Sequence, residues 1–342
     1  MKHRLLGRTG LFVSEMCLGT NSFGGTGNPM WEPIGGLDQK AATAMVARAL
    51  EHGINFFDTA NLYAAGESEQ RLGTALQEVG AKRGDVVITT KAGFRMGPGP
   101  NALGASRQHL LSAVEDSLRR LGTDYIDIYQ IHQYDRLTPM EETVRALDDL
   151  VRAGKVRYCG CSNFAAWHVM QGIGISAAER LARFEVVEGY YSIATRDLER
   201  ELVPMMQSQG VSLIVWGALL GGILTGKYPK DGTLPSGTRF SGGIWMPFDR
   251  ERTYAILDVM APMAARRDVP VGRIALAWLL AQRHVTSVLF GARTLAQLDD
   301  NVAAVSVTLS ADELAALDKV SALPPEYPGW KLAEAYADRP DP

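Results

Sequence analysis

The feature that most constrains this chain is a repeated alternation between short apolar runs and longer segments of helical periodicity. The apolar runs are of strand length and rich in Val, Ile, Phe and Tyr. Eight of them are Glu15–Leu18, Ile54–Phe57, Val86–Thr89, Tyr125–Ile131, Val156–Cys161, Phe184–Glu188, Ser212–Val215 and Ser287–Phe290. Mostly apolar strands that alternate with helices are typical of a parallel sheet covered by helices. Eight such units predict an α/β fold, the closed (β/α)8 TIM barrel, rather than an open sheet.

Residues that begin helices separate these runs. The candidate N-caps are Asp38, Ser106, Thr138 and Ser310. Thr138 is followed by Pro139, which suits the first helical position, and Ser310 is followed three residues later by Glu313, which completes a capping box. The helical segments are therefore predicted to begin where the barrel topology requires them.

Three further segments lie outside the repeat. Arg4–Leu6 and Phe12–Val13 predict an N-terminal hairpin that closes the barrel floor. Gly226–Pro247 is rich in Gly and Pro, and a long loop of this kind in a compact domain is usually functional or disordered. Arg250–Arg267 predicts an additional helix, bent or broken at Pro262. No linker divides the chain, so residues 1–342 are predicted to form a single domain.

Composition narrows the classes of function. The formal charge of −3 gives no reason to expect nucleic acid or acidic membranes as partners. No apolar run approaches the roughly 20 residues that cross a bilayer, and the N-terminus lacks the apolar core of a signal peptide. Three cysteines cannot build a disulfide framework, which favours a reducing cytoplasm. No histidine or cysteine spacing indicates a metal site. The oligomeric state stays open.

Four unlike ionisable residues follow three neighbouring strands. Asp58 and Tyr63 follow the second strand, Lys91 the third and His132 the fourth. Active sites of this barrel lie at the carboxyl ends of the strands, and neighbouring strands are about 4.8 Å apart. A lysine beside a tyrosine favours the phenolate and would bring the phenol towards the pKa of a general acid. Asp58 would hold the lysine charged, and His132 could orient a carbonyl group or share in a proton relay.

Each of these residues also has a structural interpretation. Asp58 could cap a helix, and Lys91 could be an exposed loop lysine. Tyr63 could pack half-buried, and His132 could be a satisfied residue at a strand end. Their convergence on adjacent strand ends favours the catalytic interpretation.

Longer motifs resemble those of the aldo-keto reductases. The spacing Asp58-x₄-Tyr63 with the following Gly66–Gly73 resembles the family's active-site motif. Lys91 and His132 match its lysine and histidine. Further matches extend from Leu18-Gly19-Thr20 through Gly160–Asn163 and Leu220–Lys227 to Gly291-Ala292-Arg293. The resemblance thus covers nearly the whole chain, and it implies that Tyr63 protonates a carbonyl oxygen while a nicotinamide cofactor transfers hydride.

The same resemblance implies a cofactor site. Ser162 and Asn163 would hold the carboxamide, Trp216 would stack on the nicotinamide, and Arg293 would pair with a 2′-phosphate, which favours NADPH over NADH. The residues that it assigns to the cofactor are Thr20, Asn21, Asp58, Ser162, Asn163, Glu188, Trp216, Gly217, Leu219, Lys227, Gly291, Arg293, Gln297 and Asn301. Phe23, Trp31 and Phe94 are candidate walls of an apolar substrate pocket.

Two positions depart from the family pattern. Glu188 stands where the family usually has Gln, and Gly217-Ala218 replace its Ser-Pro. A carboxylate can accept from the carboxamide but cannot donate, and it would attract the positively charged oxidised nicotinamide. The Gly221–Tyr228 segment is similar to the nucleotide-binding P-loop motif. Tyr228, however, stands where that motif has the Ser or Thr whose hydroxyl binds Mg²⁺.

The leading hypothesis is NADPH-dependent reduction of an aldehyde or ketone, with a small carbonyl compound as partner. The alternatives are an NADPH-binding regulatory or redox-sensing subunit on the same scaffold, and a barrel that has lost turnover. The presence of Asp58, Tyr63, Lys91 and His132 favours the enzyme.

Overall fold

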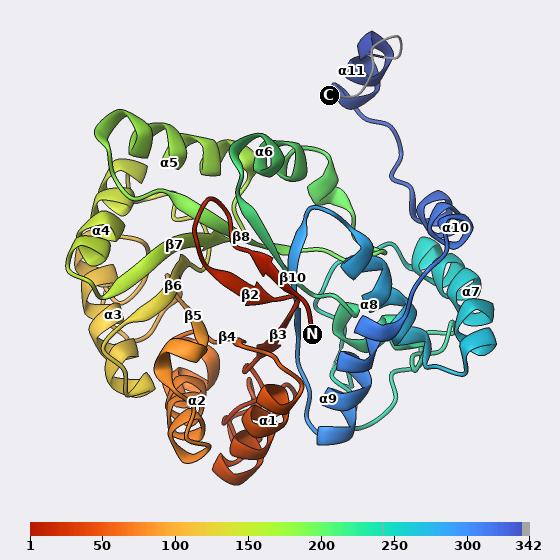
Figure 1. Cartoon of the computed structure of the whole chain (residues 1–342), viewed down its shortest axis with the longest axis horizontal. Helices are drawn as coiled ribbons and strands as arrows, with labels where there is room; N and C mark the ends of the chain where they lie inside the picture. Colours follow the sequence, from red (N-terminus) through yellow and green to blue (C-terminus); the bar gives the residue numbers. More distant parts are fainter. Residues whose placement is uncertain (242, 337–342) are drawn as a thin grey trace.

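In the computed structural model, which describes residues 1–241 and 243–336, eight parallel strands close into a barrel (Figure 1). Neighbouring strands follow one another around the barrel in the order β10-β3-β4-β5-β6-β7-β8-β9. These strands are β3 (Met16–Gly19), β4 (Phe56–Asp58), β5 (Val87–Ala92), β6 (Ile126–Ile131), β7 (Val156–Ser162), β8 (Phe184–Tyr190), β9 (Ser212–Trp216) and β10 (Val285–Phe290). Each begins within two residues of the start of a predicted run, and the prediction of a (β/α)8 barrel is confirmed.

Helices surround the barrel, and α10 and α11 are the two at the C-terminal end of the described chain (Figure 1). In chain order the helices are α1 (Gln39–Glu51), α2 (Glu67–Glu78), α3 (Arg107–Leu121), α4 (Met140–Arg152), α5 (Ala166–Glu179), α6 (Leu202–Gln209), α7 (Arg250–Arg267), α8 (Val271–Ala281), α9 (Leu295–Val302), α10 (Ala311–Ser321) and α11 (Gly329–Tyr336). Side chains of β5 and β6 are buried throughout, as expected for strands that face the barrel interior and the helices in turn. In Figure 1 α11 lies apart from the barrel.

Three of the four predicted N-caps are confirmed. Asp38, Ser106 and Ser310 each accept a backbone hydrogen bond at the start of α1, α3 and α10, and Ser310 forms the predicted capping box. The prediction for Thr138 was wrong, because its hydroxyl donates to Asp135 and Pro139 takes the cap position of α4. The additional helix predicted over Arg250–Arg267 is present as α7, and of the bend or break predicted at Pro262 the break is absent, since α7 continues through it.

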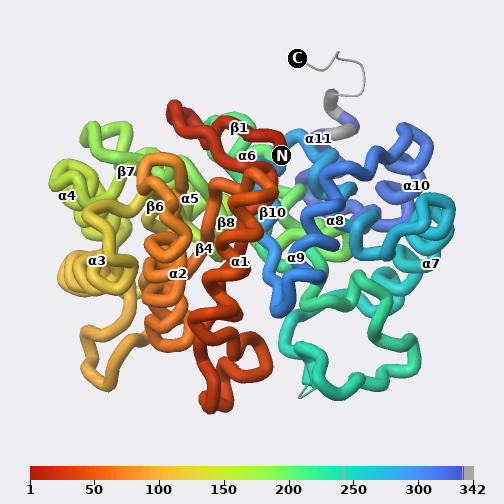
Figure 2. Tube along the Cα trace, turned by 60° about the horizontal axis from the view of Figure 1, so that its bottom comes forward, coloured from red at the N-terminus to blue at the C-terminus, as the bar shows by residue number. Residues whose placement is uncertain are grey.

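The hairpin of β1 (His3–Leu5) and β2 (Phe12–Ser14) closes one end of the barrel, as predicted. Leu6 and Val13 from this hairpin pack in one buried cluster with Cys17, Val87 and other inward-facing side chains. Figure 2 shows the hairpin at one end, and the loops after β3, β5 and β9 at the other. The floor is therefore sealed, and the opposite end is left for a site.

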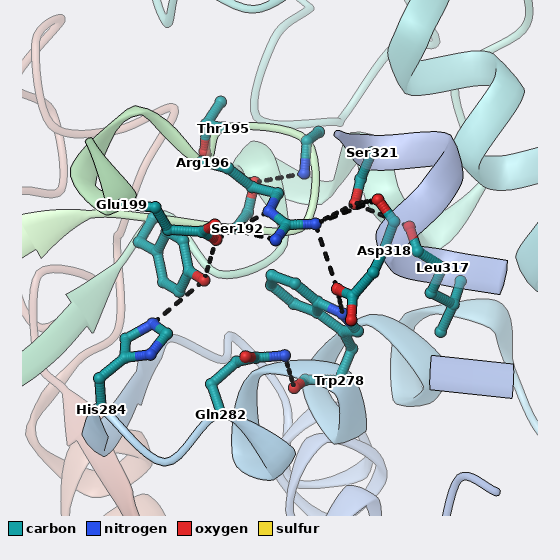
Figure 3. Close-up of polar contacts among 12 residues, drawn as sticks. Ser192, Thr195, Arg196, Glu199, Trp278, Gln282, His284, Leu317, Asp318 and Ser321 are labelled. Carbon is teal, nitrogen blue, oxygen red and sulfur yellow. Dashed lines mark hydrogen bonds and ion pairs between the residues drawn. The ribbon is translucent and has the colours of Figure 1, made fainter. Parts of the chain in front are cut away.

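A polar cluster attaches α10 to the barrel (Figure 3). Arg196, in the segment after β8, donates to both carboxylate oxygens of Glu199 at 2.7 and 2.8 Å, and to Asp318 of α10 at 3.1 Å. Trp278 of α8 is fully buried and donates to the same Asp318 oxygen at 3.1 Å. No helix among the described residues is long and apolar enough to cross a membrane.

Candidate active site

Lys91 is the centre of a buried polar cluster at the open end of the barrel. Its Nζ donates to Asp58 Oδ2 at 2.5 Å, to the Thr59 carbonyl at 3.1 Å and to Tyr63 Oη at 3.5 Å. Asp58 ends β4 and pairs in register with Thr89 of β5, two residues before Lys91. The strand ends therefore bring these groups together, and Lys91 and Asp58 are fully buried.

A strained turn positions Tyr63. The turn Tyr63–Gly66 places Ala64 and Ala65 in the left-handed region, with φ of 49° and 55°. This conformation costs an L-residue about 1–2 kcal/mol, and such strain persists where the surroundings impose it. It allows the chain to reverse directly into α2 while the phenol reaches Lys91.

His132 lies beside the phenol, and its imidazole ring is uncharged at neutral pH. Its ring packs edge-on against Tyr63 at a centroid distance of 5.8 Å and against Phe94 at 4.6 Å. Burial, together with the Lys91 charge, holds the pKa of His132 well below its ordinary value. A neutral imidazole can accept or donate one hydrogen bond, and its Nδ1 has no partner among the described residues.

The effect of Lys91 on Tyr63 is smaller than the sequence suggested. The Lys91 charge lowers the pKa of the phenol as expected, but burial outweighs it, and the charges of Asp58 and Glu188 oppose it. The pKa of Tyr63 therefore lies above its ordinary value, and the phenol holds its proton throughout the neutral range.

Glu188 belongs to the same cluster, which the sequence analysis did not predict. This side chain is 3% exposed, and its Oε2 lies 3.2 Å from Lys91 Nζ. Gln130 Nε2 donates to the same oxygen at 3.0 Å. Glu188 was expected at the carboxamide of a cofactor, but in this structure it faces the barrel interior and is engaged by Lys91 and Gln130.

A cleft of about 250 Å³ opens at the same end of the barrel as this cluster, between the loops that follow β3, β9 and β10. Eight of the residues assigned to the cofactor line it: Asn21, Gly217, Leu219, Lys227, Gly291, Arg293, Gln297 and Asn301. Gly217 has a φ of +77°, and a Cβ there would lie 2.6 Å from the Tyr190 ring. The departure at Gly217 is thus explained by the packing of Tyr190 against the cleft wall.

The cleft is lined by cations. Lys227, Arg239 and Arg293 all border it. Burial and then the charges of Arg293 and Arg239 lower the pKa of Lys227, while the carboxylate in the lining, Asp300, pairs with Arg273 at 2.6 Å. Three cations that repel one another in a partly closed cleft form a site for a polyanion.

The sequence analysis missed Arg239, because it lies in the aperiodic loop Gly226–Pro247. Part of this loop reaches the cleft, because Arg293 Nη2 donates to the Gly237 carbonyl at 2.9 Å and Arg239 is in the cleft lining. The one available signal was a cation in a long Gly/Pro loop, and that pattern alone does not indicate where the side chain points.

Other residues predicted to bind the cofactor, among them Asn163, Trp216 and Thr20, do not line the cleft. Asn163 adopts a φ of 58°, and its Nδ2 donates to Ser162 Oγ at 3.0 Å and to the His132 carbonyl at 2.9 Å. Trp216 stacks on Tyr190 at 4.6 Å, and its Nε1 has no partner within the described chain. Thr20 is fully buried, and its hydroxyl bonds to the Asp58 carbonyl, so it supports the site from behind.

The predicted apolar walls are only partly in place. Trp31 packs edge-on against Tyr63 at 5.9 Å, and Phe94 contacts His132 as described. Phe23 was wrongly predicted as a wall, because it is fully buried in the main core and its backbone pairs with Leu37. In residues 1–241 and 243–336 no group of His, Cys, Asp or Glu is arranged to hold a metal ion.

Comparison with known proteins identifies one family model and several relatives that match most of this chain. A family model described as "Aldo/keto reductase family" matches residues 15–322. The chain is 34% identical to "Versiconal hemiacetal acetate reductase" of Aspergillus parasiticus, over 93% of this chain and 96% of that protein. It is 32% identical to "L-glyceraldehyde 3-phosphate reductase" of Escherichia coli O157:H7, over 93% and 92%. It is also 36% identical to "Probable voltage-gated potassium channel subunit beta" of Arabidopsis thaliana, over 90% and 92%.

Proposed function

Since the chain belongs to the aldo/keto reductase family, we propose that it reduces aldehydes or ketones to alcohols with NADPH. One observation carries the proposal: the contacts that join Asp58, Lys91 and Tyr63 lie at the same end of the barrel as a cleft lined by cations. A proton donor and a cationic cleft at one end of the barrel suit this reaction.

The residues of the cleft fit such a cofactor. Lys227, Arg239 and Arg293 would hold its phosphates, and a guanidinium suits the 2′-phosphate that distinguishes NADPH from NADH. Ser162 and Asn163 would hold the carboxamide, and Trp216 would pack against the ring. Gly222 leaves room for this arrangement, since a Cβ there would lie 2.8 Å from Lys227 Nζ. When bound, the nicotinamide supplies the hydride.

Tyr63 would donate the proton to the carbonyl oxygen. Its raised pKa keeps the phenol protonated at neutral pH, and Lys91 would stabilise the phenolate that forms as the proton leaves. Neutral His132 would orient the carbonyl group, and Trp31 and Phe94 would exclude water from one side. Asp58 would keep Lys91 charged and fixed.

Replacing Tyr63 tests this role. Tyr63→Phe should lower turnover of a panel of aldehydes and ketones at least a hundredfold, because the proton donor is lost. Affinity for NADPH should change little, since the ring remains. NADPH absorbance measures turnover, and tryptophan fluorescence measures cofactor binding. Turnover at the wild-type rate in this variant would exclude Tyr63 as the proton donor.

A regulatory subunit that binds NADPH is the second candidate, and it is favoured by the similarity to a protein named as a potassium channel subunit. The same titrations distinguish the two functions. Tight NADPH binding without turnover of any carbonyl compound in the panel would favour the regulatory function. The free thiols of Cys17, Cys159 and Cys161 fit the reducing cytoplasm that we infer for either function.

A further inference from the structure

Two buried carboxylates share one ammonium group at the open end of the barrel. Asp58 Oδ2 and Glu188 Oε2 lie 2.5 and 3.2 Å from Lys91 Nζ. If both carboxyl groups were ionised, the cluster would carry a net charge of −1 away from water. A second carboxylate at such a site favours protonation of one member of the pair.

Asp58 and Glu188 receive fewer hydrogen bonds from the described residues than two buried carboxylates can accept. Lys91 directs its donors to Asp58, Thr59 and Tyr63, so Glu188 receives one hydrogen bond, from Gln130. Asp58 Oδ1 is buried and has no partner among the described residues. A proton held by one carboxyl group would supply the missing donor. An unpaired charged oxygen in this position would be costly.

Among residues 1–241 and 243–336, the groups that surround the carboxyl pair supply no charge other than that of Lys91. Cys17 of β3 is fully buried, and burial raises the pKa of its thiol, so it stays neutral. His132 beyond the end of β6 is neutral, and Tyr63 is protonated. Burial and the Glu188 charge raise the pKa of Asp58 well above its ordinary value. The cluster can therefore reach neutrality only by holding a proton or by receiving a cation from outside.

We propose that Asp58 and Glu188 hold one proton between them beside Lys91, and that an oxidised nicotinamide, whose ring is cationic, displaces this proton to solvent when it binds. The inference rests on the proposed function for its cofactor. Glu188 pairs in register with Ile214 of β9, two residues before Trp216, so it lies next to the proposed ring site. Glu188 is thus a positioning residue that makes binding of the oxidised cofactor depend on pH. The reduced cofactor, whose ring is neutral, should bind without releasing the proton.

The first test compares the pH dependence of two affinities. Tryptophan fluorescence titrations give Kd for NADP⁺ and for NADPH between pH 5.5 and 9. The 2′-phosphate titrates in both cofactors, so its effect cancels in the ratio of the two constants. In the wild type NADP⁺ binding should tighten relative to NADPH as pH rises, by up to about tenfold per pH unit where the pair titrates. In Glu188→Gln the ratio should lose its pH dependence.

Two variants control for structural damage. Glu188→Asp keeps a carboxyl group and should retain the pH dependence of the ratio. Glu185→Gln makes the same change on the same strand at a residue that pairs with Arg183, and should behave as the wild type. A ratio that does not depend on pH in the wild type, or that keeps its dependence in Glu188→Gln, would overturn the proposal.

The second test needs no cofactor. Infrared spectroscopy of the cofactor-free protein at pH 7 should show the carbonyl band of a protonated carboxyl group, and Glu188→Gln should lose it because Asp58 alone then pairs with Lys91. Absence of that band from the wild type would overturn the shared proton. If neither cofactor binds the wild type, the proposed function fails, while the infrared result still decides whether the carboxyl pair holds a proton.

Discussion

At the scale of single residues, burial determines which groups titrate. His284 precedes β10, and its Nε2 lies 3.2 Å from Tyr191 Oη (Figure 3). Burial lowers the pKa of His284; the Glu199 charge opposes this effect, and the Arg196 charge adds to it. The unfolded chain, with a histidine pKa of about 6.5, therefore takes up this proton before the folded protein does as pH falls.

The direction of the His284 pKa shift predicts how the stability of His284→Gln depends on pH. The contribution of His284 to the free energy of unfolding should be complete above about pH 6.5 and should be lost as pH falls below it. The wild type should therefore exceed the variant in stability most at pH 8 and less at pH 5.5. The change should stay below about 1.4 kcal/mol per pH unit, because the ring is partly exposed. Urea denaturation at both pH values measures it, and a constant difference would contradict this account.

Single residues also differ in how far the sequence predicts them. Asp58, Tyr63 and Lys91 converge as expected, because adjacent strand ends leave long side chains few other places. The contact between Glu188 and Lys91 was not predicted, since it crosses the barrel interior between strands that are not neighbours. Phe23 was predicted wrongly, because loop residues can turn inwards and sequence gives no period for them.

At the scale of elements, one glycine sets how closely α2 and α3 pack. A Cβ on Gly73 of α2 would lie 2.3 Å from the Leu121 carbonyl oxygen of α3. Gly73→Ala must therefore push the helices apart, and it should lower the free energy of unfolding by about 1–3 kcal/mol. Chemical denaturation measures the loss.

A second helical glycine provides the matched control. Gly174 lies inside α5, and a Cβ there would meet nothing within 4 Å. Gly174→Ala should leave stability unchanged or raise it by up to about 1 kcal/mol, because alanine has the higher helix propensity. Equal effects of the two substitutions would show that helix contact does not explain the requirement at Gly73.

Whole elements were predictable where periodicity is strong. Strands such as β6 and β7 lie within one residue of their predicted bounds. An apolar run between two helical segments is most stable as a barrel strand, because both of its faces are then buried. The loop Gly226–Pro247 carries no period, so neither its fold nor the position of Arg239 could be predicted. Thr138 is not the cap because α4 begins at Met140 with Pro139 in the cap position, one residue later than predicted, and the Thr138 hydroxyl donates to Asp135.

At the scale of the whole molecule, the two ends of the barrel have opposite roles. The hairpin lies at one end, and the long loops after β3, β5 and β9 lie at the other (Figure 2). Apolar side chains seal the hairpin end, whereas the cations Lys227, Arg239 and Arg293 line the cleft at the loop end. A cofactor in the cleft would connect the loops after β3, β9 and β10, which are far apart in sequence. Ligand binding should therefore stabilise the molecule as a whole.

The resulting prediction concerns thermal unfolding. NADPH at about 100 times its Kd should stabilise the protein by about 2.7 kcal/mol, which raises Tm by several degrees. NADH at the same concentration should raise Tm less, because it lacks the phosphate that Arg293 would hold. Arg293→Ala should bring the two shifts together, whereas Arg119→Ala, an exposed arginine of α3, should change neither. Added salt should reduce the advantage of NADPH, since it depends on charge. Equal shifts with NADPH and NADH in the wild type would mean that the cations of the cleft do not recognise the 2′-phosphate.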